Sequence, residues 1–305
     1  MRILTSHDRF NYQPITSRPD YVWPDGNRLA VYIGFNVEHF EFGGGLGAKL
    51  APSSEPDVLN HAWREYGNRV GAFRCLDLFS KLDIPVGALV NTALYDHAPQ
   101  LMDALRARGD EFVGHGHTNA DRQNSTDEAD ERALITGCAA RIEQMEGTPP
   151  QGWLSPWIAE SAATPDLLQE CGYGYTLNWC HDDQPLQMQT RKGSLWSIPY
   201  PQELNDIPML VARQMDMVPF ARMIEDQFDE MLRQSVQQPL VMGIALHPYL
   251  VGQPYRLKLL REALQNIRRR GQAWWTTPGR IHEHVRTVEA LQAFGLPPSS
   301  CSEAR

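Results

Sequence analysis

The sequence has few of the features that mark secreted or membrane-spanning proteins. Its five cysteines are odd in number and contain no C-x-x-C pair, which favours reduced thiols over a disulfide framework. No apolar run approaches the ~20 residues that a membrane helix needs, and the N-terminal stretch lacks the apolar core of a signal peptide. We therefore expect a cytoplasmic protein with no membrane partner.

Basic residues are also in short supply. The chain has 28 Lys and Arg against 37 Asp and Glu, giving a net charge of -9. Nucleic acid and anionic membrane surfaces both require a basic face, so neither is expected as the main partner. The hydrophobic fraction of 42% is ordinary for a globular protein. A chain of 305 residues can bury a sizeable core.

Strand-like and helix-like segments alternate about seven times along the chain. Alternation at this spacing predicts parallel strands joined by crossover helices. No linker-like break interrupts it, so we predict a single-domain α/β fold, a (β/α) barrel or a distorted relative. The expected strands are 28–35, 85–91, 111–114, 152–154, 173–177, 195–198, 240–246 and 273–276; the expected helices are 67–82, 97–108, 125–145, 164–171, 220–237, 255–270 and 278–293. Ser125 or Thr126 is the expected N-cap of the third helix.

Two end segments lie outside this alternation. Residues 1–26 carry prolines that would interrupt a helix and read as an extended N-terminal arm. The barrel is expected over 27–293, followed by a loose tail over 294–305. Because the arm has little periodicity of its own, it would gain order by packing on a neighbouring subunit. We therefore expect a homo-oligomer, either a dimer or a tetramer.

Polar residues follow the expected strands at their carboxyl ends, where barrel enzymes collect their catalytic groups. A lone histidine at such a place usually caps a strand, but a set of polar residues at several strand ends predicts a shared pocket. The members of this set are Asn36, Glu38, Asn91, His115, Ser155, Asn178, Asp182, Asp183 and His247.

Four short motifs make the chain resemble the polysaccharide deacetylase superfamily, whose fold is a distorted (β/α)7 barrel. They are Asn36-Val37-Glu38, His115-Gly116-His117-Thr118-Asn119, Gly152-Trp153-Leu154-Ser155-Pro156-Trp157 and His247-Pro248. The resemblance extends from about Trp23 to His284, most of the chain. It implies a barrel hydrolase with its site at these motifs.

The motifs depart from the metal-dependent members of this superfamily. Those members carry Asp-x-Asp and His-x-x-x-His, which provide a base and three metal ligands. Here Asn36 stands for the base, Glu38 for the ligand aspartate, and Asn119 for the second ligand histidine. Asn119 is a poor zinc ligand, and His117 could replace it only if the loop re-aimed its side chain.

The same departures resemble the allantoinase-like branch, which includes relatives acting on cyclic imides and is regarded as working without a catalytic metal. Stretches 65–69, 182–185, 198–200, 205–206 and 252–254 are similar to that branch. The resemblance implies hydrolysis of a small cyclic amide or imide, such as a hydantoin, without a cofactor. The candidate substrate-binding residues are Tyr66, Arg69, Trp153, Asp182, Tyr200 and Asn205.

Opening such a ring requires a water to attack a carbonyl and the ring nitrogen to leave with a proton. Glu38 is the candidate general base, and we expect a partly dry pocket to raise its pKa towards neutrality. His115 could hold Glu38 or stabilise the oxyanion, and His247 could protonate the leaving nitrogen. Asn36 and Arg69 are candidate donors to the carbonyl oxygen.

Two other functions remain open at this point. The first is a metal-dependent amino-sugar N-deacetylase, with Glu38, His115 and either Asn119 or His117 binding zinc. The second is a ligand-binding barrel that lost catalysis when its base became Asn36. Cell-wall polymers lie outside the cytoplasm, which argues against the first. The joint presence of Glu38, His115 and His247 argues against the second.

Overall fold

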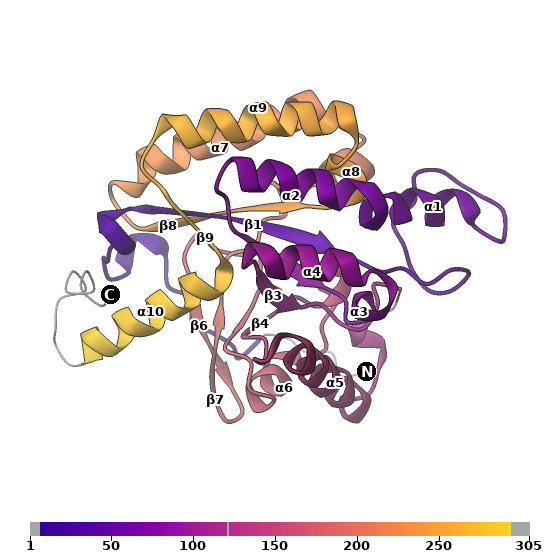
Figure 1. The fold of residues 1–305 in the computed structure, drawn as a ribbon. Coiled ribbons are helices and arrows are strands. Elements are labelled where there is room, and N and C mark those ends of the chain that lie inside the picture. The colour runs from indigo at the N-terminus through magenta and orange to yellow at the C-terminus, as the bar shows by residue number, and fades with distance from the viewer. Residues whose placement is uncertain (1–6, 121, 294–305) are drawn as a thin grey trace.

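A curled sheet of nine strands organises the chain (Figure 1). The computed structural model describes residues 7–120 and 122–293. Neighbouring strands follow the order β6-β7-β5-β4-β3-β2-β1-β8, and β9 also pairs with β1. All pairs are parallel except β6 with β7. The strands are β1 Leu29–Val37, β2 Val86–Val90, β3 Glu111–Gly114, β4 Gly152–Trp153, β5 Tyr175–Thr176, β6 Leu186–Thr190, β7 Gly193–Ser197, β8 Leu240–Leu246 and β9 Trp274–Thr276.

Helices connect the parallel strands and cover the sheet. In Figure 1, α7 and α9 lie side by side above β1 and β8, while α5 and α6 lie at the opposite side of the molecule. None of the described helices is long and apolar enough to cross a membrane. The helices are α1 Val58–Tyr66, α2 Ala72–Lys81, α3 Leu94–His97, α4 Pro99–Arg108, α5 Glu128–Glu146, α6 Thr164–Glu170, α7 Met217–Ser235, α8 Pro248–Val251, α9 Pro254–Arg270 and α10 Pro278–Ala293.

The central strand β1 is buried along its whole length. Its near-continuous apolar sequence suits a parallel strand with both faces covered. Within it, Gly34 makes room for Tyr200, because a Cβ on this glycine would lie 3.0 Å from the tyrosine ring. The ring can therefore lie close against β1, which brings Tyr200 near the polar residues at the carboxyl end of the strand.

The predicted single-domain (β/α) barrel type is confirmed, and most expected elements agree with the structure within a few residues. The short helices α3 and α8 were not predicted, and three further elements differ. Strand β6 was missed, because its alternating LQMQT pattern is that of a half-exposed edge strand and lacks a long apolar run. Helix α1 was also missed. The first turns of the helix expected over 67–82 form a π-helix, Gly67–Gly71.

The N-cap of α5 was wrongly expected at Ser125 or Thr126. Asp127 occupies that position, and its carboxylate accepts the backbone N–H of Asp130 at 2.9 Å. A carboxylate is a good cap because it accepts a hydrogen bond and interacts favourably with the positive end of the helix dipole.

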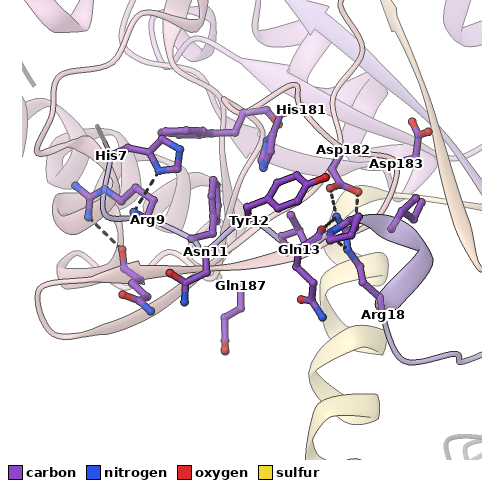
Figure 2. A pocket seen from close by; sticks show the side chains of 16 residues that line it. His7, Arg9, Asn11, Tyr12, Gln13, Arg18, His181, Asp182, Asp183 and Gln187 are labelled. Carbon is purple, nitrogen blue, oxygen red and sulfur yellow. Dashed lines mark hydrogen bonds and ion pairs between the residues drawn. The ribbon is translucent and has the colours of Figure 1, made fainter. Parts of the chain in front are cut away.

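The N-terminal arm packs on its own chain (Figure 2). Arg9 pairs with Asp166 at 2.7 Å, and Arg18 pairs with Asp182 at 2.6 Å. The backbone N–H of Gln189 on β6 donates to the carbonyl of Arg9 at 2.7 Å. Within residues 7–26, the arm therefore has partners in its own subunit. The tail expected over 294–305 lies outside the described residues.

The homo-oligomer stays a prediction, now without the support of the arm. Light scattering at micromolar protein should give a mass of two or four chains. A particle of 34.6 kDa would contradict it.

Candidate active site

A small cavity lies where β1, β3 and β8 end, the edge at which parallel α/β folds place their chemistry. Its volume is about 140 Å3. Seven of the candidate residues predicted from the sequence line it together, and Asn119 lines it as well. The seven are Asn36 and Glu38 from β1 and its end, His115 after β3, Ser155 after β4, His247 after β8, and Tyr200 and Asn205 from the segment before α7.

Glu38 lies at the centre of this group and is only 7% exposed. Its Oε1 accepts a hydrogen bond from Asn119 Nδ2 at 2.9 Å. The same oxygen faces His115 Nε2 at 3.4 Å and His247 Nε2 at 3.6 Å. Its Oε2 is buried and has no hydrogen-bond partner among the described residues. One carboxylate oxygen is thus held by the protein and the other is left for an occupant of the cavity.

The pKa of Glu38 does not rise as we expected from the sequence. Burial raises this pKa, but the positive charge of His247 and hydrogen bonds from His115 and His247 outweigh burial and lower the pKa to about 2. Glu38 is therefore ionised at neutral pH, and its lowered pKa makes it a weaker base than we expected from the sequence.

His247 lies between two carboxylates. Its Nδ1 contacts Asp206 Oδ1 at 2.6 Å, and its backbone N–H donates to Asp206 Oδ2 at 2.8 Å. Burial lowers the pKa of His247, but the charges of Asp206 and Glu38 outweigh it and raise the pKa to about 10. The ring is thus an imidazolium at neutral pH, with Nε2–H directed towards Glu38.

Asp206 is fully buried and was missed by the sequence analysis. It directly follows Asn205, which was selected from the same stretch. Its partner His247 lies 41 residues further along the chain. In the sequence, Asp206 is only an acidic residue next to the candidate Asn205. Its pairing with His247 becomes visible in the fold, which places the start of the π-helix Ile207–Ala212 against the end of β8.

His115 and Asn36 are fixed by contacts with the backbone and with Tyr200. His115 Nδ1 faces the carbonyl oxygen of Leu154 at 2.7 Å. That oxygen can only accept, so Nδ1 carries a hydrogen, while Nε2 faces Glu38 Oε1. Asn36 Nδ2 donates to the hydroxyl of Tyr200 at 3.1 Å and to the carbonyl of Leu246 at 3.4 Å. The Asn36 amide is therefore already engaged within the wall of the cavity.

Four of the predicted substrate-binding residues lie outside the cavity. Arg69 is 76% exposed in its side chain and pairs with Glu65 at 3.4 Å, as an i, i+4 pair on a helix surface. The Tyr66 hydroxyl contacts the carbonyl of Gly252 at 3.4 Å, away from the cavity. A role for either residue at the Glu38 carboxylate is not supported by this placement.

The other two of these four serve packing and the arm. Trp153 is fully buried in a satellite core, where its indole donates to Ser155 Oγ at 3.0 Å. Asp182 binds the guanidinium of Arg18 through both of its oxygens, each at 2.6 Å. Figure 2 shows this pair beside the arm. The sequence could not predict where these two side chains point, because the residue pattern of a short strand end or a loop does not show which way a side chain faces.

Two residues in the wall of the cavity have unusual backbones. Trp157 and Ile158 have φ angles of 63° and 53°, in the left-handed region that bulky and β-branched residues rarely adopt. Such strain costs ~1–3 kcal/mol per residue and clusters at functional sites. The indole of Trp157 donates to the backbone carbonyl of Asn119 at 2.9 Å, so the strained turn holds a residue of the site.

The residues named above as alternative metal ligands do not fit a zinc ion. The amide of Asn119 directs its Nδ2–H at Glu38, and an amide is a poor zinc donor in either orientation. His117 Nδ1 contacts the hydroxyl of Thr92 at 3.0 Å, and His117 does not line the cavity. Over residues 7–120 and 122–293, no three His, Cys, Asp or Glu side chains are grouped to hold an ion.

The chain is similar to several known proteins. The polysaccharide deacetylase family model matches residues 65–176. A peptidoglycan deacetylase of Helicobacter pylori is 22% identical, over 81% of this chain and 93% of the relative. The crystal structure of PuuE allantoinase is 25% identical, with a TM-score of 0.78 over 91% of this chain and 98% of that one.

A second crystal structure shares the fold. A probable polysaccharide deacetylase of Pseudomonas aeruginosa PAO1 superposes with a TM-score of 0.79 over 90% of this chain and 98% of that chain, at 22% identity. The fold, the family match and the relatives agree with one another. Residues 65–176 therefore match the polysaccharide deacetylase family, and the chain as a whole is similar in sequence and fold to polysaccharide deacetylases and to an allantoinase, which are C–N bond hydrolases.

Proposed function

We propose that the protein hydrolyses a small cyclic amide or imide, such as a hydantoin, without a catalytic metal. The observation that carries this proposal is an ionised carboxylate, Glu38, 3.6 Å from a charged imidazolium, His247, where both buried side chains line one small cavity. A base and an acid placed side by side are what amide hydrolysis requires. The similarity to PuuE allantoinase supports a ring substrate.

The size of the cavity favours a ring of few atoms. Its volume of about 140 Å3 is well below the ~300–1,000 Å3 typical of sites for drug-sized ligands. Its walls combine Phe40, Leu154 and Ile207 with polar amides. A polymer would need an open groove, so these dimensions favour a small heterocycle over a polysaccharide.

The reaction follows from the positions of the two charged groups. Glu38 Oε2 takes a proton from water as the water oxygen attacks a ring carbonyl. The ring C–N bond of the tetrahedral intermediate then breaks, and His247 Nε2–H gives its proton to the leaving nitrogen. Asp206 holds the imidazolium in place through Nδ1. The products are a carboxyl group and an amide or amine on one opened chain.

The two alternatives have less support. A zinc-dependent deacetylase would need a third ligand that Asn119 and His117 do not provide in this arrangement. Glu38, His247 and Asp206 form a buried row of charged groups, and burying charges costs free energy. A barrel that only binds a ligand without catalysis would not need such a row.

A substrate panel tests the proposal. The purified wild-type protein is incubated with hydantoin, succinimide, glutarimide and dihydrouracil, and in parallel with N-acetylglucosamine and its oligomers. NMR then follows ring opening and acetate release. We expect ring opening of at least one heterocycle and no acetate. Acetate release without ring opening would support the deacetylase.

The pH profile is a further prediction. The acid His247 must be protonated, so kcat/KM should fall only as pH rises through its pKa of about 10. The base Glu38 must be ionised, so activity should persist to well below its ordinary pKa of 4.5. We expect a flat profile across neutral pH. A basic limb at the ordinary histidine pKa of 6.5 would show that His247 is not held as an imidazolium.

A further inference from the structure

We propose that Asn119 is a positioning residue that, together with Glu38, holds the hydrolytic water. This inference rests on the proposed ring hydrolysis. It starts from two oxygens, Glu38 Oε2 and Asn119 Oδ1, which are both buried and lack a hydrogen-bond partner in the described part of the chain. Both belong to side chains that line the cavity, and these side chains are joined by the 2.9 Å hydrogen bond from Asn119 Nδ2 to Glu38 Oε1.

Both oxygens are acceptors that a donor in the cavity can satisfy. Each of them can only accept, and a buried acceptor without a partner costs ~1–3 kcal/mol. A single water molecule has two O–H donors and can satisfy both oxygens at once. Its lone pairs then remain free to attack the carbonyl carbon. Of the two acceptors only Glu38 is basic, so the proton moves to Oε2 while the Asn119 amide keeps the second hydrogen in place.

Three contacts fix the orientation of Asn119. Its backbone N–H donates to the carbonyl of His39 at 2.8 Å, and its own carbonyl accepts the indole N–H of Trp157 at 2.9 Å. Its Nδ2 donates to Glu38 Oε1, which fixes the orientation of the amide and leaves Oδ1 as its free acceptor within the described part of the chain. The strained backbone of Trp157, with φ 63°, positions the indole that donates to the Asn119 carbonyl. The acceptor is therefore aimed before substrate enters, as preorganisation requires.

Kinetics of Asn119→Ala and Asn119→Asp test this role on a ring that the wild type opens. We expect Asn119→Ala to lower kcat ~10²-fold with little change in KM, because misplacing a reactant costs about that much and the ring contacts remain. Asn119→Asp retains an acceptor but sets a second carboxylate beside Glu38. One of the two then binds a proton more tightly, so the acid limb of kcat/KM should move to higher pH.

A merely structural role predicts a different result. In that case kcat and KM would change together, the melting temperature would fall, and the acid limb would stay in place. Trp157→Phe provides an intermediate case, since it removes the indole N–H and keeps Asn119. We expect a smaller loss of kcat than in Asn119→Ala. Wild-type kcat in Asn119→Ala would overturn the inference while leaving the proposed function intact.

A crystal structure at a resolution that shows ordered water decides the inference without activity. We expect one water within ~3 Å of both Glu38 Oε2 and Asn119 Oδ1 in the wild type, at hydrogen-bond distance, and its loss in Asn119→Ala. Maps that show ordered water elsewhere in the cavity but none bridging these oxygens would overturn it. If the wild type opens no ring, the proposed function fails, and this comparison still decides whether the water site exists.

Discussion

Replacing Glu38 by Gln is expected to lower ring-opening turnover by ~10²- to 10⁴-fold, the usual contribution of a general base. The two side chains have nearly the same shape, so the change removes charge and basicity from a carboxylate whose pKa is held at about 2. It also removes one of the two negative charges that raise the pKa of His247. Initial rates at neutral pH and saturating substrate measure the effect.

Glu41→Gln is the matched control for this variant. Glu41 lies three residues further along, is exposed, and lines a different hollow from the Glu38 cavity. We expect its rate to equal that of the wild type. Circular dichroism and thermal unfolding establish that Glu38→Gln remains folded. If folded Glu38→Gln retains more than half of the wild-type turnover, Glu38 is not the base.

Replacing Asp206 by Asn is expected to have the second large effect. Asp206 is the larger of the two charges that raise the pKa of His247 to about 10. Without it, burial and the single charge of Glu38 oppose each other, and the pKa of His247 should move down towards 6.5. The basic limb of kcat/KM should then enter the neutral range. Turnover above that limb should fall by ~10²-fold or more, as general acid catalysis is lost.

The same variant makes a prediction for stability. The folded-state pKa of His247 lies above its unfolded value of 6.5. Its charge therefore stabilises the fold fully below pH 6.5, and this contribution is lost as pH rises towards about 10. Denaturant unfolding should show the alkaline loss in the wild type and a smaller one in Asp206→Asn. Exposed Asp216→Asn is the control. An unchanged basic limb in Asp206→Asn would contradict the role assigned to Asp206.

The sequence was sufficient to predict the part of the site that depends on strand ends. Long apolar runs identified β1 and β8, and the residues directly after them are polar. Since the carboxyl ends of parallel strands meet at one edge, Glu38, His115 and His247 could be expected in one pocket. The structure brings them together there.

Directions of side chains could not be predicted in the same way. Arg69 was selected from a stretch that turned out to form a π-helix, and its side chain points to solvent. Asp182 was selected beside a strand end, but the arm provides Arg18 as its partner. The sequence holds no signal for which of two faces a short segment presents, or for a partner more than 100 residues away.

The electrostatics of the site depend on contacts that only the fold reveals. Burial of Glu38 was foreseen, and burial alone would raise its pKa. The lowered pKa arises because His115 and His247, from two other strands, both face the same oxygen. His247 in turn owes its charge to Asp206, which no strand-end rule selects.

The measurement that tests the central claim most directly is activity after exhaustive chelation, combined with elemental analysis of the same sample. The account predicts that the treated protein opens a cyclic amide or imide at the untreated rate and contains no stoichiometric zinc. The reasons are that the amide of Asn119 stands at the third ligand position, and that Glu38 and His247 provide a base and an acid. One zinc per chain, with a deacetylase activity on acetamido sugars that chelation abolishes and zinc restores, would contradict it.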